Sequence, residues 1–175
     1  PQTQSLDALK KASTSNPSIS FQNGFPLSVM VNVSTQGNTP VERARDFLST
    51  YQDLYNISNP DLTLEVLRSG NRNGRDYVTF YQTYKGIPVY GSSLVVNLNG
   101  QNVILTSGKL LHGDVDIDIV PKISQEVAEN EAMSALGLAE AKPLGETQLM
   151  LYDVSLNSDT PSSPRLVWRV RLQSA

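Results

Sequence analysis

Residues 77–111, YVTFYQTYKGIPVYGSSLVVNLNGQNVILTSGKLL, decide the fold of this chain. The segment opens at 77–81 with five consecutive residues that favour strands. Gly86 and Pro88 then interrupt the run, because glycine permits a positive φ and proline has no N–H for a strand ladder. The first part of the segment therefore predicts one strand followed by a sharp turn.

The second part of the segment predicts a hairpin. Residues 93–98 alternate in polarity, Asn99-Gly100 is a strong two-residue turn signal, and an apolar run returns at 103–105. Together with the strand at 77–81, this gives three antiparallel strands in a meander. Such a meander is stable only when one face is covered, so we expect a helix to lie on it.

A helix at 41–55 is predicted to provide that cover. Thr39, Pro40 and Glu42 form a capping box with proline at the first helical position. Apolar residues then recur at helical spacing: Val41, Ala44, Phe47, Leu48, Tyr51, Leu54 and Tyr55. We interpret the aromatic members of this stripe as core rather than as a binding site, because burial produces this regularity.

The remaining N-terminal elements are shorter. Residues 5–12 are either a short helix capped by Ser5 or a frayed terminus. Strands are predicted at 18–21, 27–33 and 62–67 from their alternation and flanking turn residues.

The C-terminal part predicts a second helix and further strands. Residues 114–120 alternate acidic and apolar side chains and read as a strand. Ser124 caps a helix that ends near Leu136, before Gly137, with an inward face of Val127, Ala128, Ala132, Met133 or Ala135, and Leu136. Two strands, at 148–154 and 166–172, flank a polar loop at 157–164.

Residues 81–91, YQTYKGIPVYG, resemble the Q-x-x-x-G-x-P-V-x-G signature of the fungalysin/thermolysin propeptide (FTP) domain. The resemblance implies the prosegment of a secreted zinc metallopeptidase. We expect the glycines to shape the strand crossing. The candidate partner-contact residues in this segment are Gln82, Tyr84, Lys85, Pro88 and Tyr90.

A second resemblance follows the first. ISQEVA at 123–128 and RLVWRV at 165–170 are similar to a PepSY domain, which follows FTP in the same prosegments. The two resemblances imply an α+β fold of two cystatin-like units, each one helix on an antiparallel sheet. We expect an FTP-like domain at 1–112 and a PepSY-like domain at 113–175, C-terminally truncated relative to full-length prosegments.

Composition limits the alternatives. The 175 residues are 39% hydrophobic and 18% charged, as in an ordinary globular protein. The net charge of −3, with no basic stripe, argues against a nucleic-acid partner. The chain has no cysteine and no apolar run of the ~18 residues that cross a bilayer, so neither disulfides nor a membrane is expected.

Catalytic signatures are missing from the sequence. A zinc peptidase needs H-E-x-x-H, whereas the chain has a single histidine, His112, and no G-x-S-x-G elbow. Asp114, Asp116 and Asp118 begin like an EF-hand loop, but Ile119 and Gln125 stand where that loop needs Gly and Glu. We therefore expect a solvated acidic strand face, no catalytic residue, no metal and no cofactor.

The resemblance implies a function as intramolecular chaperone and inhibitor of the catalytic domain of a thermolysin-like metallopeptidase, in a secreted, extracellular or periplasmic setting. The alternative is a free-standing FTP/PepSY module that binds or regulates proteins without a peptidase domain. A fragment lacking the segment that enters the protease cleft is expected to inhibit poorly on its own.

Overall fold

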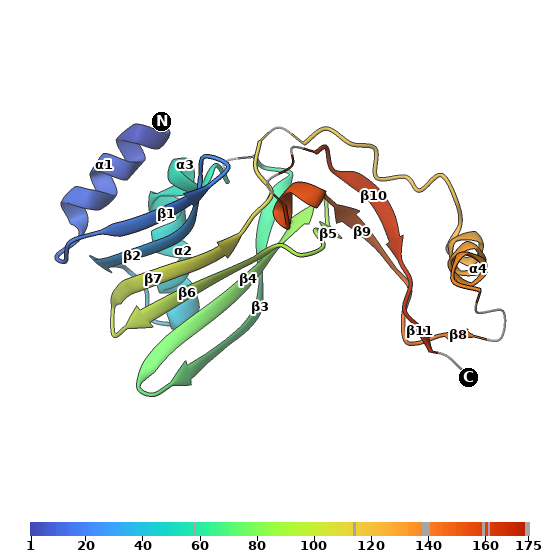
Figure 1. Cartoon of the computed structure of the whole chain (residues 1–175). Helices are drawn as coiled ribbons and strands as arrows, with labels where there is room; N and C mark the ends of the chain where they lie inside the picture. Colours follow the sequence, from blue (N-terminus) through green and yellow to red (C-terminus); the bar gives the residue numbers. More distant parts are fainter. Residues whose placement is uncertain (58, 114, 138–140, 159, 161, 174–175) are drawn as a thin grey trace.

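The chain folds into two lobes joined in an arch (Figure 1). The computed structural model describes residues 1–57, 59–113, 115–137, 141–158, 160 and 162–173. The first lobe contains α1 (Gln2–Ala12), β1 (Ser18–Gln22), β2 (Phe25–Ser34), α2 (Pro40–Thr50), α3 (Gln52–Tyr55), β3 (Leu62–Arg72), β4 (Arg75–Tyr84), β5 (Ile87–Pro88), β6 (Ser93–Asn99) and β7 (Asn102–Lys109). The second contains α4 (Gln125–Ala135), β8 (Lys142–Pro143), β9 (Gln148–Tyr152), η1 (Val154–Leu156), β10 (Arg165–Arg169) and β11 (Leu172–Gln173). The predicted α+β class is confirmed.

The described strands of the first lobe form one seven-stranded sheet in the order β1-β2-β7-β6-β4-β3, with β5 paired to the end of β4. The predicted meander is confirmed as β4, β6 and β7, all antiparallel. Asn99 pairs with Asn102 across the tight turn at Gly100, whose φ is +60°. The N-terminal hairpin joins the meander through the β2–β7 pairing.

The predicted capping box starts α2. The Thr39 side chain accepts from the Glu42 N–H at 3.2 Å, and the Glu42 carboxylate accepts from the Thr39 N–H at 3.0 Å. Hydrogen bonds from the backbone N–H groups of Asn38 and Thr39 hold the pKa of Glu42 below its ordinary value. The helix ends sooner than predicted, because Tyr51 leaves helical geometry, at φ −113° and ψ 26°, and α3 follows as a separate turn.

In the first lobe, α2 and α3 lie against one face of the sheet (Figure 1). The apolar stripe of these helices is buried there. Phe47, Tyr51 and Tyr55 belong to this core, so the prediction that they pack inside is confirmed. The Tyr55 hydroxyl lies 2.6 Å from Thr106 Oγ1, and burial raises the pKa of this phenol. The N-terminal helix also packs here through Leu9, although it begins at Gln2 and is not capped by Ser5.

The second lobe is thinner than the first. Its described strands form two separate ladders of two strands each, β9–β10 and β8–β11. The Ser124 cap on α4 is confirmed, with the Val127 N–H donating to Oγ at 3.3 Å. The predicted inward face of α4 is wrong for Val127 and Leu136, which are 42% and 65% exposed. The helix makes few contacts with the β9–β10 and β8–β11 ladders, and Ala128 is the residue of α4 that is buried.

Residues 115–120 connect the lobes without joining a sheet. The prediction of a strand here is therefore wrong, because residues 115–120 form no backbone ladder with another strand. The alternation itself is confirmed in the burial: Val115 is buried and Asp116 and Asp118 are exposed. Asp114 lies outside the described residues. Burial of one face alone thus keeps this connector extended.

The capping box gives a first testable prediction. Replacing Thr39 with alanine should lower the free energy of unfolding by about 1 kcal/mol at neutral pH, because one N–H at the helix start loses its acceptor. Urea unfolding followed by circular dichroism measures this. Thr50→Ala at the exposed end of the same helix is the matched control and should change stability by less than about 0.5 kcal/mol. Equal effects from both variants would contradict the assignment of the cap.

Candidate functional site

The side chain of Gln82 lies at the joint between the lobes. It is 1% exposed and lies near the end of β4, just before the turn to β5. Its Oε1 accepts from the Leu111 N–H at 2.6 Å, and its Nε2 donates to the Leu111 carbonyl at 2.9 Å. A primary amide carries both a donor and an acceptor, so one side chain satisfies both main-chain groups of Leu111. The strand is thereby tied to the start of the connector.

The turn that follows Gln82 is held by the same strand. The main-chain carbonyl of Gln82 accepts from the Val89 N–H at 2.9 Å, and its N–H donates to Ser92 Oγ at 2.9 Å. Ser92 Oγ donates in turn to the Val89 carbonyl at 3.0 Å. Lys85 and Gly86 both have positive φ, 48° and 82°, which closes the tight turn between β4 and β5. The glycine of the signature therefore shapes the chain, as expected.

This turn contacts the second lobe directly. The Tyr90 N–H donates to the Leu151 carbonyl at 2.8 Å, and Val89 bridges to Leu151 in a parallel pairing. The rings of Tyr90 and Tyr152 lie 6.0 Å apart. A second hydrophobic core forms around these contacts from residues of both lobes and the connector: Leu62, Tyr84, Val89, Leu111, Val115, Leu151 and Leu156. The signature segment thus builds the joint.

The structure corrects two of the five candidate partner contacts. Gln82 and Tyr84 are 1% and 0% exposed, so their side chains belong to the interior and do not reach a partner. Both sit on a strand whose two faces are covered near the joint, a coverage that alternation along one strand does not reveal.

The other three candidates are accessible and stay a prediction. Lys85 is exposed, with Nζ 3.6 Å from the Asp61 carboxylate and 4.9 Å from the centroid of the Tyr84 ring. Pro88 is half-buried. Tyr90 is exposed, and the Arg169 guanidinium lies 5.8 Å from the centroid of its ring.

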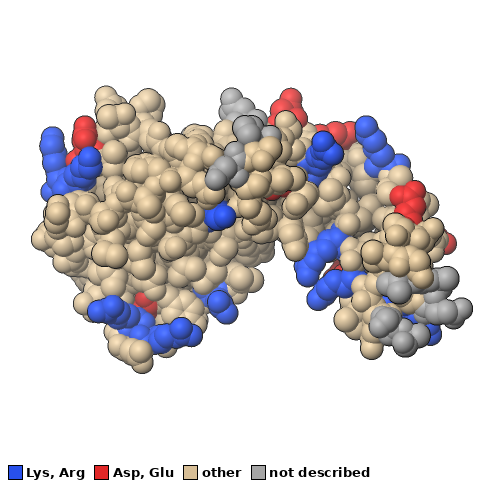
Figure 2. Space-filling view, viewed as in Figure 1, with Lys and Arg blue, Asp and Glu red and all other residues tan. Residues whose placement is uncertain are grey.

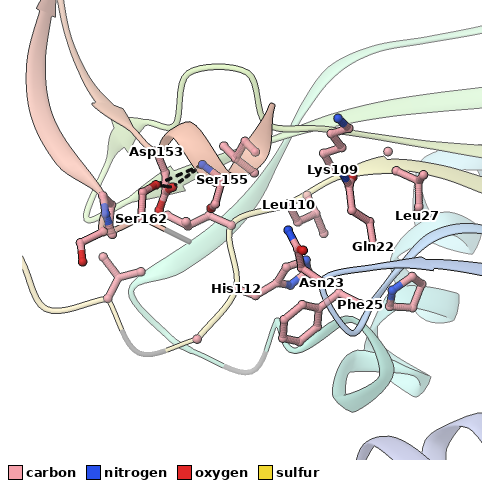
Figure 3. A pocket seen from close by; sticks show the side chains of 18 residues that line it. Gln22, Asn23, Phe25, Leu27, Lys109, Leu110, His112, Asp153, Ser155 and Ser162 are labelled. Atoms are coloured by element: carbon pink, nitrogen blue, oxygen red, sulfur yellow. Dashed lines mark hydrogen bonds between the residues drawn. The ribbon is translucent and has the colours of Figure 1, made fainter. Parts of the chain in front are cut away.

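A pocket of about 450 Å³ opens beside the joint (Figure 3). The β1–β2 turn, residues 108–113 and the loop after β9 line it, and both polar and apolar side chains face it. At one end, the buried Asp153 carboxylate accepts from the Ser155 N–H at 2.8 Å and from the Ser162 hydroxyl. These bonds hold Ser155 and Ser162 of the second lobe beside the pocket.

His112 anchors the opposite wall of this pocket. Its Nδ1–H donates to the Tyr55 carbonyl at 2.9 Å, and its ring stacks on Phe25 at a centroid distance of 3.8 Å and an interplanar angle of 15° (Figure 3). Burial lowers the pKa of His112 to about 4, so the ring is neutral at pH 7. The hydrogen bond and the stacked ring therefore fix this side chain within the fold.

Sequence reasoning missed a basic groove at the far end of the sheet. Arg68, Arg72 and Arg75 line it, on the face opposite α2. Lys and Arg side chains gather over the β3–β4 hairpin at the lower left of Figure 2. The signal was present in the sequence: residues 68 and 72 are on the same face of a strand, and the Asn73-Gly74 turn folds Arg75 back beside them.

The described residues contain neither a metal-binding cluster nor a membrane-crossing helix. No group of three His, Cys, Asp or Glu side chains there is placed to hold a metal ion. None of the described helices is long and apolar enough to cross a bilayer.

Comparisons with known proteins match part of the chain. Residues 64–109 match the model of the Fungalysin/Thermolysin Propeptide Motif family. The comparison with curated proteins finds no match. Among solved structures, the chain is similar to the Bacillus megaterium YpeB C-terminal domain, with 21% identity and a TM-score of 0.43, over 90% of this chain and 66% of that one. The family match begins in β3 and ends with β7.

The joint gives a second testable prediction. Gln82→Leu should lower the free energy of unfolding by about 2–4 kcal/mol, because it leaves the buried N–H and carbonyl of Leu111 without partners. Chemical unfolding of the whole chain measures this. Gln101→Leu is the matched control: Gln101 is exposed in the β6–β7 turn, and the change there should cost less than about 0.5 kcal/mol. A loss at Gln82 no larger than at Gln101 would contradict the proposed joint.

The histidine gives a third prediction. The folded pKa of His112 lies below its unfolded value, so the unfolded chain binds more protons between about pH 6.5 and pH 4. The stability that the neutral ring contributes is full above about pH 6.5 and is lost as the pH falls toward 4, by at most about 3 kcal/mol. His112 is the single histidine of the chain, so its NMR titration is unambiguous.

The control for that prediction is His112→Gln, which keeps a donor near the Tyr55 carbonyl but does not titrate. Between pH 7 and pH 4 the free energy of unfolding of this variant should fall less than that of the unchanged chain. An NMR pKa near 6.5, or identical pH profiles for both proteins, would contradict the buried neutral ring.

Proposed function

We propose that this chain belongs to the prosegment of a thermolysin-like or fungalysin-type protease. In this role it acts as an intramolecular chaperone and inhibitor of the catalytic domain. The observation that carries the proposal is the match of residues 64–109 to the propeptide motif. Those residues run from β3 to the end of β7 and include the meander. They supply Val78, Phe80, Leu94, Val96, Leu98 and Val103 to the first core, and they contain the turn that builds the joint. The matched region thus contributes to both cores of the structure.

The proposed mechanism is stabilisation of a partly folded protease by a preformed surface. A secreted protease benefits from a high barrier to unfolding, since transient opening exposes it to cleavage. The same barrier slows its folding. A template that binds the partly folded chain lowers that barrier by its binding free energy and then leaves.

A template of this kind needs a surface that does not rearrange on binding. The Gln82–Leu111 hydrogen bonds and the shared second core hold the two lobes together, so their outer faces keep one arrangement. Ordering such a surface in advance reduces the entropy lost on association. Lys85, Pro88 and Tyr90 are exposed or half-buried beside this joint, and we propose them as contact residues.

The domain boundary is also a proposal, and the same geometry supports it. We place an FTP-like domain at 1–112 and a PepSY-like domain at 113–175. The sheet of the first lobe ends with β7, and the described chain then runs as the extended connector to α4. We further propose a secreted or periplasmic setting, where such proteases act, and a protease catalytic domain as partner.

Refolding tests the function. Denatured catalytic domains of the thermolysin-like and fungalysin types are diluted into buffer with the whole chain, or with the same mass of serum albumin. The chain should raise the recovered peptidase activity several-fold with at least one type. Added in excess to the corresponding native enzyme, it should lower the activity only weakly.

Variants make the refolding assay specific. Lys85→Ser with Tyr90→Ser should reduce the gain, whereas Lys10→Ser on α1 should leave it unchanged, with thermal unfolding confirming that each variant is folded. Unchanged recovery with both protease types would contradict the chaperone role. Binding to native enzyme without improved refolding would favour the free-standing binding module instead.

A further inference from the structure

The basic groove at the end of the sheet is about 630 Å³ in volume and lies on the open face of three strands. The cross-strand register defines it. Arg68 pairs with Thr79, Gly70 with Tyr77, and Arg72 with Arg75, while β6 adds the next row of the floor. Paired residues point to the same face of a sheet. The groove residues are therefore Arg68, Arg72, Asn73, Arg75, Tyr77, Thr79, Val95 and Asn97.

In the described part of the chain, the side chains of the three arginines have no hydrogen-bond or ion-pair partner. The ion pair found there is Lys85 with Asp61, at the other end of β4. Asp76, next to Arg75 in sequence, shares the opposite face with buried Val78 and accepts from the Asn71 amide at 2.8 Å. Arg72 and Arg75 stand directly opposite one another, and like charges in that position destabilise a hairpin. The positive charges of the groove therefore do not stabilise the fold, and the pair at Arg72 and Arg75 opposes it.

A second observation lies on the groove floor. Thr79 is 3% exposed, yet its Oγ1 is buried without a hydrogen-bond partner. Buried hydroxyls nearly always have a hydrogen-bond partner, because a hydroxyl without one loses its hydrogen bonds to water and gains none in the protein. The hydroxyl is on β4, between Arg68 on β3 and Val95 on β6. A bound acceptor in the groove would satisfy this hydroxyl, provided that the neighbouring side chains of the groove move aside.

The floor also shows which kind of ligand fits. The Tyr77 ring covers Gly70, where a Cβ would come within 2.8 Å of the Tyr77 hydroxyl. With Val95 and Asn97 alongside, the floor is aromatic, aliphatic and amide in turn, which suits an extended peptide more than a bare inorganic ion. Guanidinium groups match carboxylates with two parallel hydrogen bonds. The net charge of −3 disfavours long polyanions such as nucleic acids.

We propose that this groove binds an acidic peptide segment of a partner protein, with Arg68, Arg72 and Arg75 engaging carboxylates and the Thr79 hydroxyl donating to the bound segment. The site is distinct from the joint and lies at the other end of β4. The proposal does not depend on the prosegment function, since it concerns carboxylate recognition by the chain itself.

The test is binding of a fluorescently labelled, end-blocked hexaglutamate peptide to the whole chain, measured by anisotropy at 50 mM and 300 mM salt. The peptide should bind, more weakly at the higher salt, while a hexaglutamine peptide should not bind. The triple variant R68Q/R72Q/R75Q should bind at least about tenfold more weakly, through loss of charge-assisted hydrogen bonds. The triple variant K10Q/K11Q/R165Q, with the same change in charge at exposed remote positions, should lose much less.

Variants of Thr79 distinguish a specific binding site from nonspecific electrostatic attraction. Thr79→Val should weaken peptide binding by several-fold to about tenfold while leaving the melting temperature unchanged or higher, since the unpaired hydroxyl is removed. Thr79→Ser should retain most of the binding. Equal losses from the two triple variants, or unaltered binding by Thr79→Val, would overturn the proposal. So would displacement of the peptide by inorganic phosphate at equal concentration, which would indicate a simple anion site.

Discussion

The arrangement of the whole chain depends on one side-chain amide. Gln82 satisfies both main-chain groups of Leu111 inside a buried joint. Hydrogen bonds in such surroundings are strong, and the cost of leaving them unmade is correspondingly high. The bonds hold the connector where Leu111 and Val115 can enter the second core beside Leu151. The second lobe is therefore positioned by contacts with β3, β4, the turn that follows β4, and the connector.

This constraint changes how the signature segment is understood. Residues that look like recognition elements in sequence, Gln82 and Tyr84, are the interior of the joint. The turn around Gly86 and Pro88 presents Tyr90 to the second lobe, where its N–H pairs with Leu151. A segment that orders two lobes relative to each other is well suited to a template, because a template acts through a fixed surface. Under the proposed function, recognition belongs to exposed positions around the joint and on the open sheet face.

The two lobes are stabilised differently. The first has a continuous core between α2, α3 and the sheet, to which α1 adds Leu9. The second relies on narrow ribbons, on the joint and on single hydrogen bonds, such as that from Trp168 Nε1 to the Ile123 carbonyl at 3.0 Å. Val127 and Leu136 consequently stay exposed on α4. We expect local opening to be easiest there, since few apolar contacts hold the helix in place.

The sequence by itself determined the elements whose causes are local. The capping box at Thr39, the Asn99-Gly100 turn and the alternation of 93–98 each specify their structure through neighbouring residues, and all three are found. The helical spacing of the apolar residues in α2 and α3 likewise predicted that they are buried. It did not predict the break in the helix at Tyr51. The α+β class follows from such local signals.

Only the tertiary structure decided what depends on residues distant in the chain. Burial of Gln82 requires the main chain of Leu111 and the apolar residues of the second lobe, none of which alternation on β4 reveals. Exposure of Val127 depends on how little sheet lies beneath α4. The basic groove exists because the β3–β4 register sets Arg72 opposite Arg75 and places Thr79 between two other strands. Side chains on separate strands meet through pairing, and pairing is a property of the folded chain.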